Sequence, residues 1–459
     1  MAAFGKKKKA SEFPDVIPVS EAIRKGDIFT KLTCLIMGAG NLARKQIIQG
    51  LLFLAGELAY IFYMVFYGAK ALQNFVTLGT ETQKKVFNEA TQVYEYATGD
   101  NSQLCLLYGV VTFFVTIGFI LLWRAAIRSS YIAQKAQEAG KKPITFGQIL
   151  KDLKDNRMYQ LFLLFPFLGI ILFTVMPLVF MILMAFTNYD RDHLPPGKLF
   201  DWVGFQNFAR VLNAGGALGE TFWRVLGWTI IWAIFATFLN YIFGIILAII
   251  INRDGTKFKA FWRFIFVLTI AVPQFVSLLV VNTMIQEHGV INLLLKELFG
   301  VGPLPFLTNV TWARVTVIVI NLWVGIPYTL LAVTGILKNI PAELYEAARV
   351  DGANAFVTFF KITMPYMMFV MTPNLITTFT GNINNFNVIY FLTGGGPTNS
   401  EYYQAGSTDL LVTWLYKLTV SAKDYNLASV IGILIFAISA TFSLLAYTRS
   451  SSFKEGAAK

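Results

Sequence analysis

The chain has 459 residues, of which 56% are hydrophobic and only 14% are charged. This number of charged side chains is too small to cover the surface of a soluble protein of this length. The composition therefore predicts a polytopic membrane protein. The net charge of +12 would suit nucleic acid, but the pattern contains no folded soluble module to present a basic site, so no nucleic-acid partner is expected.

Eight stretches are predominantly apolar over about 20 residues, the length that a helix needs to cross a bilayer. In chain order they are residues 47–69, 104–123, 159–187, 222–251, 264–286, 313–336, 366–391 and 427–448. The first is the weakest because it contains Glu57, which we expect to pair with a neighbouring helix or to extend to the membrane surface. Membrane helices tolerate proline and often bend there, and prolines lie within several spans: Pro166, Pro177, Pro273, Pro327 and Pro373.

The predicted fold class is therefore all-α, a polytopic membrane protein of about eight transmembrane helices. A basic segment, residues 1–46, precedes two spans and a basic loop in residues 47–158. Six further spans occupy residues 159–448, and residues 449–459 form a tail.

The distribution of Lys and Arg predicts the orientation in the membrane. If the N-terminus is cytoplasmic, 27 of the 38 Lys and Arg residues lie in the inside segments, which are residues 1–50, 124–158, 252–263, 337–365 and 449–459. Because cytoplasmic segments carry the excess of positive charge, both termini are predicted to be cytoplasmic. No short apolar core with a small-residue cleavage site follows the basic N-terminus, so no cleaved signal peptide is expected.

The sequence lacks the motifs of enzymes that could work in this setting. GxxxxGK[ST], HExxH and GxSxG are all absent, so the chain has no P-loop of its own to bind ATP. The two histidines, His193 and His288, are far apart in predicted outside loops, and Cys34 and Cys105 form no CxxC pair. We therefore expect no catalytic residues, no metal site and no cofactor.

The six spans from residue 159 onward contain no Asp or Glu in their interiors. Ion-coupled carriers usually place ionisable groups at mid-membrane to bind the coupling ion. Backbone carbonyls could bind Na⁺ without carboxylates, so an ion-coupled carrier remains the alternative. Without an ion site or an ATPase, a transporter would have to take its energy from a partner.

A charged segment, "PAELYEAARVDGANAFVTFFKITMP", interrupts the apolar pattern at residues 341–365. Pro341 suits the first turn of a helix that runs to Val350, with Asn339 or Ile340 as its cap. Gly352 can adopt the left-handed conformation that ends a helix. A second helix is expected from about Asn354 to Thr363, before Pro365 begins the next span. Shape alone permits a surface hairpin or an element that docks to a partner.

EAA at Glu346 to Ala348, then Gly352, Ile362 and Pro365, resemble the EAA loop of the membrane subunits of binding-protein-dependent ABC importers. Met364 departs from the family, which often has Leu there, and this change conserves volume. The resemblance implies that the loop at about 338–365 couples the membrane helices to a separate ATP-binding subunit dimer. The coupling residues that it implies are Glu346, Ala347, Ala348, Asp351, Gly352, Ile362 and Pro365.

Three further stretches, "NLWVGIPY", "NINNFNVIYFLTGGGP" and "STDLLVTWLYKLT", resemble the MalF-type permease family of maltose and maltodextrin importers. The resemblance implies a six-span permease core with two additional N-terminal spans, in the bacterial cytoplasmic membrane. The implied partners are a MalG-type second permease, an extracellular solute-binding protein and an oligosaccharide substrate. The loop at 188–221 has only 34 residues, too few for the folded insertion of enteric members, which fits a Gram-positive host.

Two spans each present a polar helical face that could bind sugar. The i, i+3, i+4, i+7 pattern places Asn321, Val324, Gly325 and Tyr328 on one face. The other face holds Thr378, Gly381, Asn382 and Asn385 with the same spacing. Amides can donate to and accept from sugar hydroxyls, and a tyrosine ring can cover the apolar face of a pyranose. Spacing alone fits packed membrane helices equally well.

The maltose permease resemblance favours the sugar-binding interpretation of these faces. It implies substrate contacts at Asn321, Gly325, Tyr328, Thr378, Gly381, Asn382 and Asn385. Gly381 departs from the enteric relative, which has an aromatic residue at that position, and glycine has no ring that could stack on a sugar.

Overall fold

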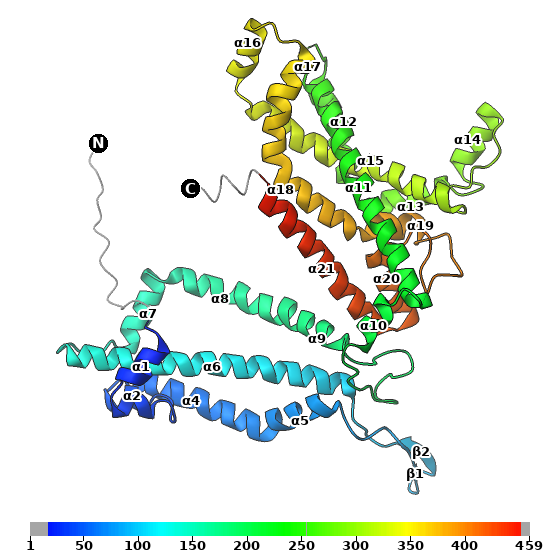
Figure 1. Cartoon of the computed structure of the whole chain (residues 1–459). Coiled ribbons are helices and arrows are strands. Elements are labelled where there is room, and N and C mark those ends of the chain that lie inside the picture. The colour runs from blue at the N-terminus through cyan, green and yellow to red at the C-terminus, as the bar shows by residue number, and fades with distance from the viewer. Residues whose placement is uncertain (1–16, 254, 451–459) are drawn as a thin grey trace. The chain divides into compact units, whose positions relative to one another are not determined.

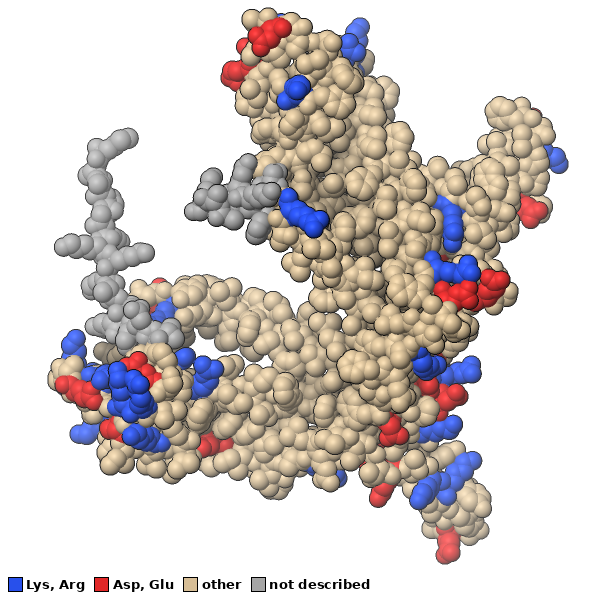
Figure 2. Space-filling model, viewed as in Figure 1, with Lys and Arg blue, Asp and Glu red and all other residues tan. Residues whose placement is uncertain are grey.

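The computed structural model describes residues 17–253 and 255–450, and these residues form two compact units. The N-terminal unit comprises residues 17–183 and 192–202, and the C-terminal unit comprises residues 184–191 and 203–450. Both units are mostly helical (Figure 1). The long helices carry few charged side chains between their ends, as Figure 2 shows, which agrees with the predicted membrane spans.

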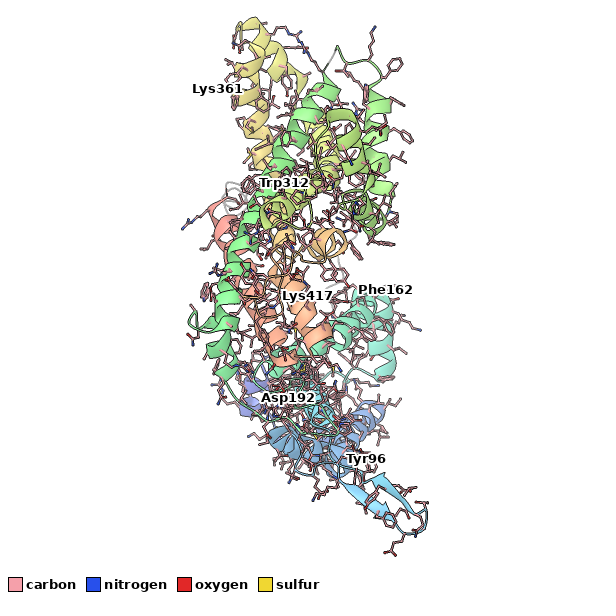
Figure 3. All side chains as sticks on the ribbon, turned by 90° about the vertical axis from the view of Figure 1, so that its right-hand side faces the viewer. Tyr96, Phe162, Asp192, Trp312, Lys361 and Lys417 are labelled. Atoms are coloured by element: carbon pink, nitrogen blue, oxygen red, sulfur yellow. The ribbon has the colours of Figure 1, made fainter. Side chains whose placement is uncertain are left out.

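The N-terminal unit contains short helices, two long spans and a hairpin. Its elements are α1 (Val19–Lys25), α2 (Ile28–Leu32), α3 (Ala39–Ala43), α4 (Ile47–Tyr63), a π-helical turn (Met64–Gly68), α5 (Ala69–Thr77), β1 (Lys85–Asn88), β2 (Val93–Tyr96), α6 (Ser102–Glu138), α7 (Phe146–Asp155), α8 (Met158–Ile170), a second π-helical turn (Ile171–Val175) and α9 (Met176–Met184), whose last residue begins the other unit. The antiparallel hairpin of β1 and β2, marked by Tyr96 in Figure 3, is the one sheet in the described chain and a small departure from the all-α prediction.

The C-terminal unit is built on α11, α15, α18 and α21, with shorter helices between them. Its elements are α10 (Gln206–Leu212), α11 (Ala217–Asn252), α12 (Lys259–Ala271), α13 (Gln274–Met284), α14 (Val290–Phe299), α15 (Val310–Asn339), α16 (Ala342–Val350), α17 (Ala355–Thr358), a π-helical turn (Phe359–Thr363), α18 (Met364–Ile383), α19 (Phe386–Thr393), α20 (Leu411–Lys417), a π-helical turn (Leu418–Ala422) and α21 (Tyr425–Arg449). Two fully buried tryptophans, Trp232 and Trp414, anchor two of its apolar clusters.

The predicted spans correspond to the long helices of the structure. Within the described residues, seven helices are long and apolar enough to cross a membrane, and an eighth span is present if one bent pair counts as a single span. That pair, α12 and α13, is bent by 90° at Val272 and Pro273. The expectation of one continuous helix over 264–286 is therefore corrected: Pro273 has no N–H for a helical hydrogen bond, and Val272 before it is extended, with ψ 128°.

The span of residues 158–184 groups with the N-terminal unit up to Leu183, whereas the sequence analysis placed it at the start of the six-span core. None of the residues of α8 and α9 is buried within this chain. An apolar helix with no buried residue in its own chain leaves most of its surface for lipid or for another subunit.

Glu57 in α4 accepts a hydrogen bond from the backbone N–H of Met37, at 2.8 Å. Its partner is thus the turn between α2 and α3, not a side chain of another spanning helix. Such a donor stabilises a carboxylate that is buried or lies in the membrane. This hydrogen bond therefore accounts for Glu57 as a structural residue of the N-terminal unit.

Segments that were predicted to share one side of the membrane lie together within each unit. In the N-terminal unit, Gln134 of α6 accepts from the backbone N–H of Asp27, at 2.9 Å. In the C-terminal unit, one cluster joins Ile251 at the end of α11, Leu337 near the end of α15 and Phe359. Figure 1 shows α16 and α17 at this end of the unit and α10 at the opposite end.

Candidate functional site

A polar cavity of about 440 Å³ lies between the long helices of the C-terminal unit. Six of the seven predicted sugar-contacting residues line it: Asn321, Gly325, Tyr328, Thr378, Asn382 and Asn385. The structure adds lining residues that the sequence analysis missed or did not assign to the sugar: Asn240, Tyr241, Gln274, Val324, Thr329, Ala332 and Asn374. None of these lining residues is charged, so the wall offers neutral amides, hydroxyls and phenol rings.

Helix geometry explains how the two predicted faces meet. Asn321, Gly325 and Tyr328 lie on α15, and Thr378 and Asn382 lie on α18. Residues three and four apart share one face of an α-helix, so each helix presents its polar set to the same space.

Gly381 is the predicted residue that the structure does not bring to this cavity. It lies at the border of the polar face and lines a separate cavity with Thr377, Asn384 and Ser443. A Cβ added at Gly381 would meet no atom within 4 Å, so open space surrounds it. A direct sugar contact at this position is not supported by the geometry of the chain.

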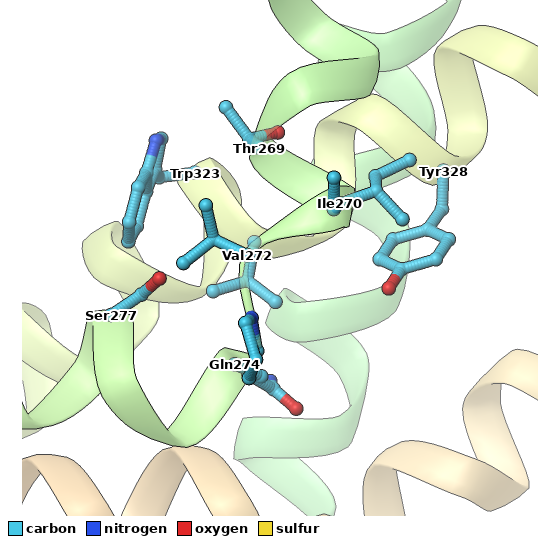
Figure 4. A pocket seen from close by; sticks show the side chains of 10 residues that line it. Thr269, Ile270, Val272, Gln274, Ser277, Trp323 and Tyr328 are labelled. Atoms are coloured by element: carbon cyan, nitrogen blue, oxygen red, sulfur yellow. The ribbon is translucent and has the colours of Figure 1, made fainter.

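A smaller cavity of about 140 Å³ adjoins the first and shares Gln274, Val324 and Tyr328 with it. In Figure 4, Gln274 lies directly after the bend between α12 and α13, with Trp323 on one side and the Tyr328 ring on the other. Gln274 is the first residue of α13, directly after the bend. The bend thus explains why a straight span did not predict Gln274 as a lining residue.

Two of the predicted residues also hold the structure together. Asn382 is 8% exposed, and its Nδ2 donates to Thr237 Oγ1 at 2.9 Å. The backbone oxygen of Asn382 accepts from Trp232 Nε1 at 3.1 Å. Asn385 caps α19 by accepting from the backbone N–H of Val388 at 3.2 Å. These side chains therefore fix the junction of α18 and α19 at the cavity wall.

Other polar groups of the wall have unused hydrogen-bonding capacity. Asn321 Nδ2 and Asn240 Oδ1 are buried and have no hydrogen-bond partner within the described chain. Tyr328 is 57% exposed, so its ring and hydroxyl are open. Asn374 donates to Tyr241 Oη at 2.7 Å, which aligns two further polar groups along the wall. Because unpaired polar groups are costly, a hydroxyl-bearing ligand or water would stabilise this arrangement.

Gly325 makes room for a neighbouring side chain and not for a ligand. A Cβ at this position would lie 2.0 Å from Asn240 Nδ2, well inside van der Waals contact. The Asn240 amide donates to the Ala236 carbonyl at 2.6 Å and so has little freedom to move. Gly325 therefore permits α11 and α15 to approach with an amide between them.

We expect Gly325→Ala to destabilise the chain by about 1–3 kcal/mol, the usual cost of overpacking. Gly335→Ala is the matched control on the same helix, because a Cβ at Gly335 meets no atom within 4 Å. Thermal unfolding of the purified variants in detergent measures both effects. Equal unfolding temperatures for the two variants would contradict the steric role of Gly325.

The predicted coupling segment folds as a helix followed by a left-handed turn. The helix α16 begins at Ala342, one residue later than expected, and its N-cap is Pro341 instead of Asn339 or Ile340. Gly352 has φ +71°, the left-handed conformation that was predicted. Tyr345 and Thr363 join the two arms through their hydroxyls at 3.1 Å.

The second arm differs from the prediction. Instead of a separate helix ending before Pro365, α17, a π-helical turn and α18 follow one another without a gap in the chain. Pro365 is the second residue of α18 and directly follows the π-helical turn. This continuity connects the turn at Gly352 directly to the helix that carries Thr378 and Asn382.

The predicted coupling residues are mostly open to a partner. Glu346, Ala347, Asp351, Gly352 and Pro365 are exposed. Ala348 is buried and Ile362 is half-buried, so these two pack inside the segment. Val350 and Phe356 are 88% and 71% exposed, which leaves apolar side chains uncovered beside the acidic ones.

The motifs "TGGGP" and "STDLL" contact one another in the C-terminal unit. Asp409 is 1% exposed, and its Oδ2 lies 2.6 Å from Lys417 Nζ. Burial raises the pKa of Asp409, and the Lys417 ammonium opposes this shift. Gly395 has φ +81°, and a Cβ there would overlap Asp409 Oδ1. The glycine run thus allows the chain to pass directly over this ion pair.

Comparison with known proteins assigns the chain to a family. Residues 240–452 match the family model of the binding-protein-dependent transport system inner membrane component. The chain is 37% identical over 439 residues to the galactooligosaccharides transport system permease protein GanP of Bacillus subtilis (strain 168), covering 93% of this chain and 98% of GanP. It is 35% identical to the maltodextrin transport system permease protein MdxF of the same strain, covering 92% and 95%.

Two further comparisons match part of the chain. The maltose/maltodextrin transport system permease protein MalF of Escherichia coli (strain K12) is 38% identical over 256 residues, which cover 55% of this chain and 49% of MalF. A solved bacterial alginate ABC transporter, in complex with an alginate pentasaccharide-bound periplasmic protein, has a TM-score of 0.55 at 23% identity. The match covers 65% of this chain and 96% of that one and supports the fold.

Proposed function

The chain belongs to the family of binding-protein-dependent transport system inner membrane components, and on this premise we propose that it is the permease subunit of an ATP-driven importer of maltodextrin-type oligosaccharides. The observation that carries the substrate class is the 440 Å³ cavity, whose wall offers amides and hydroxyls but no charge. Sugars present many hydroxyls and no net charge, so this wall matches them in chemistry.

Galactooligosaccharides are the second candidate substrate class, beside the maltodextrins. The sequence identity of this chain is 37% to GanP and 35% to MdxF. GanP is named for galactooligosaccharide transport and MdxF for maltodextrin transport. Either sugar carries the hydroxyl groups that the wall would bind. Competition between the two unlabelled oligosaccharides against radiolabelled maltotriose uptake would decide between them.

The coupling segment supports a division of labour among subunits. We infer that α16 docks to an ATP-binding subunit on the cytoplasmic side, because its acidic and apolar side chains are exposed there. A second permease of similar fold would complete the pore, and an extracellular solute-binding protein would deliver the sugar. The clustering of the predicted inside segments within each unit supports cytoplasmic termini.

Uptake should therefore depend on ATP and not on an ion gradient. Proteoliposomes that contain the full complex should accumulate labelled maltotriose only when ATP is present on the side of the ATP-binding subunits and the binding protein is present on the opposite side. Ionophores should leave this uptake unchanged, and the chain purified without ATPase subunits should hydrolyse no ATP. Uptake driven by a Na⁺ or proton gradient without ATP would instead assign an ion-coupled carrier.

A further inference from the structure

The N-terminal unit contains a cavity of about 760 Å³ that transport through the C-terminal unit does not explain. It lies between the turn that joins α3 to α4 and the segment that joins α6 to α7. Lys45 and Gln49 line it from the first side, and Lys142 and Thr145 line it from the second. Its wall contains no acidic side chain.

Hydrogen bonds hold the two sides of this cavity together. Gln46 Nε2 donates to the Ile144 carbonyl at 2.6 Å, and Gln46 Oε1 accepts from Asn41 Nδ2 at 2.7 Å. Arg44 also lines the cavity, but both oxygens of Asp27 lie 2.6 Å from its Nη2. The charge of Arg44 is thus compensated, and the cavity has fixed walls.

Two lysines of the wall have uncompensated charge. Lys45 and Lys142 are exposed, and neither forms an ion pair with another residue in the described part of the chain. Lys45 has φ +62°, a conformation that glycine adopts more readily than lysine. Glycine would therefore suit this turn better than lysine does. The lysine at this position supplies a positive charge that glycine would not.

A buried amide and a helix terminus add to the polar side of the cavity. Gln49 is 7% exposed, and its Oε1 has no hydrogen-bond partner within the described chain. Thr145 is the N-cap of the ten-residue helix α7, whose N-terminal end favours anions. An occupant with a phosphate and a hydroxyl donor would satisfy the lysines, the helix terminus and the Gln49 oxygen together.

The apolar side of the cavity indicates where this occupant comes from. Ile47 and Ile48, the first residues of the span α4, line the cavity and are 59% and 56% exposed. Leu51 and Leu52 continue this exposed strip along α4, at 52% and 55%. A free phosphate ion has no group to cover such a strip, whereas acyl chains would cover it.

We propose that this cavity binds the headgroup of an anionic phospholipid with a hydroxyl-bearing headgroup, such as phosphatidylglycerol. The phosphate lies between Lys45, Lys142 and the N-terminus of α7, and the acyl chains follow α4. Figure 2 shows Lys and Arg side chains at the end of the unit where α1 and α2 lie, with Asp and Glu side chains among them. Basic pockets at the ends of membrane helices bind such headgroups in general.

Native mass spectrometry of the delipidated full complex tests this proposal. The probes are phosphatidylglycerol, phosphatidylcholine with the same acyl chains, and inorganic phosphate. We expect phosphatidylglycerol to bind about tenfold more tightly than phosphatidylcholine, and Lys45→Gly with Lys142→Gln to remove about tenfold of that affinity. Lys141→Gln is the matched control, because Lys141 is the exposed neighbour of Lys142 and does not line the cavity.

Three results would overturn the proposal. They are equal affinity for the two lipids, unchanged phosphatidylglycerol affinity in the double variant, and displacement of phosphatidylglycerol by millimolar inorganic phosphate. The thermal unfolding temperature of the double variant checks its fold, which should persist because glycine suits the turn at residue 45. Lys142→Gln alone, with an expected loss of about threefold, provides a second variant that leaves this turn unaltered.

Discussion

Gly352→Pro should abolish sugar-stimulated ATP hydrolysis and transport while the chain still inserts into the membrane. Gly352 has φ +71°, whereas proline fixes φ near −65°, so the turn after α16 could not form. Proline also lacks the N–H that Gly352 donates to the Arg349 carbonyl at 3.2 Å. The conformational penalty of about 3 kcal/mol or more falls on the one segment that joins α16 to α18.

Gly352→Asn is the matched control for this prediction. Asparagine tolerates the left-handed conformation, and a Cβ at residue 352 would meet no atom within 4 Å. Glu346→Lys tests the same segment differently, because it reverses an exposed charge without altering the backbone. ATPase activity of the reconstituted complex, with and without sugar and binding protein, is the measurement. Normal coupling in Gly352→Pro and Glu346→Lys would show that the segment is a surface hairpin.

Hydropathy predicted the spanning helices because each must satisfy its own backbone in lipid. The same reasoning could not locate the 90° bend at Pro273, since Pro166 and Pro327 lie inside helices that continue past them. A proline permits a bend, but packing decides whether the helix continues. The hairpin at residues 85–96 was also missed, because the predicted outside loop gave no clear strand alternation.

The sequence predicted those lining residues of the cavity that share one face of a single helix. Spacing gave six of its lining residues, five on α15 and α18 and Asn385 at the start of α19. The same spacing extended backwards from Thr378 reaches Asn374. Asn240 is the one amide side chain in the predicted span 222–251, which gives a weak signal by itself. Gln274 could be predicted as a lining residue only if the bend was known. The close approach of Gly325 to Asn240 could be predicted only if the packing of the two helices was known.

The structure also separates binding residues from structural ones among the predicted set. Asn382 is buried and bonded to Thr237, so its loss would leave a buried partner unsatisfied and disturb the fold itself. Tyr328 is 57% exposed, so it can be truncated with little effect on folding. Asn374 is exposed but donates to the buried Tyr241 hydroxyl at 2.7 Å, so its truncation also removes this hydrogen bond. Tyr328 therefore gives the clearer test of the sugar site.

Tyr328→Ala should lower maltodextrin uptake about 5- to 150-fold, because losing a hydrogen bond to a ligand costs about 1–3 kcal/mol and the ring contact is lost as well. Tyr328→Phe should recover part of this loss, since the ring still covers the apolar face of a sugar. Leu331→Ala is the control, because Leu331 is 40% exposed on the same helix and does not line the cavity. Uptake by proteoliposomes, with assembly and basal ATP hydrolysis measured in parallel, separates binding from folding. If Tyr328→Ala and Asn374→Ala both transport at the rate of the unaltered chain, the sugar passes through another part of the complex.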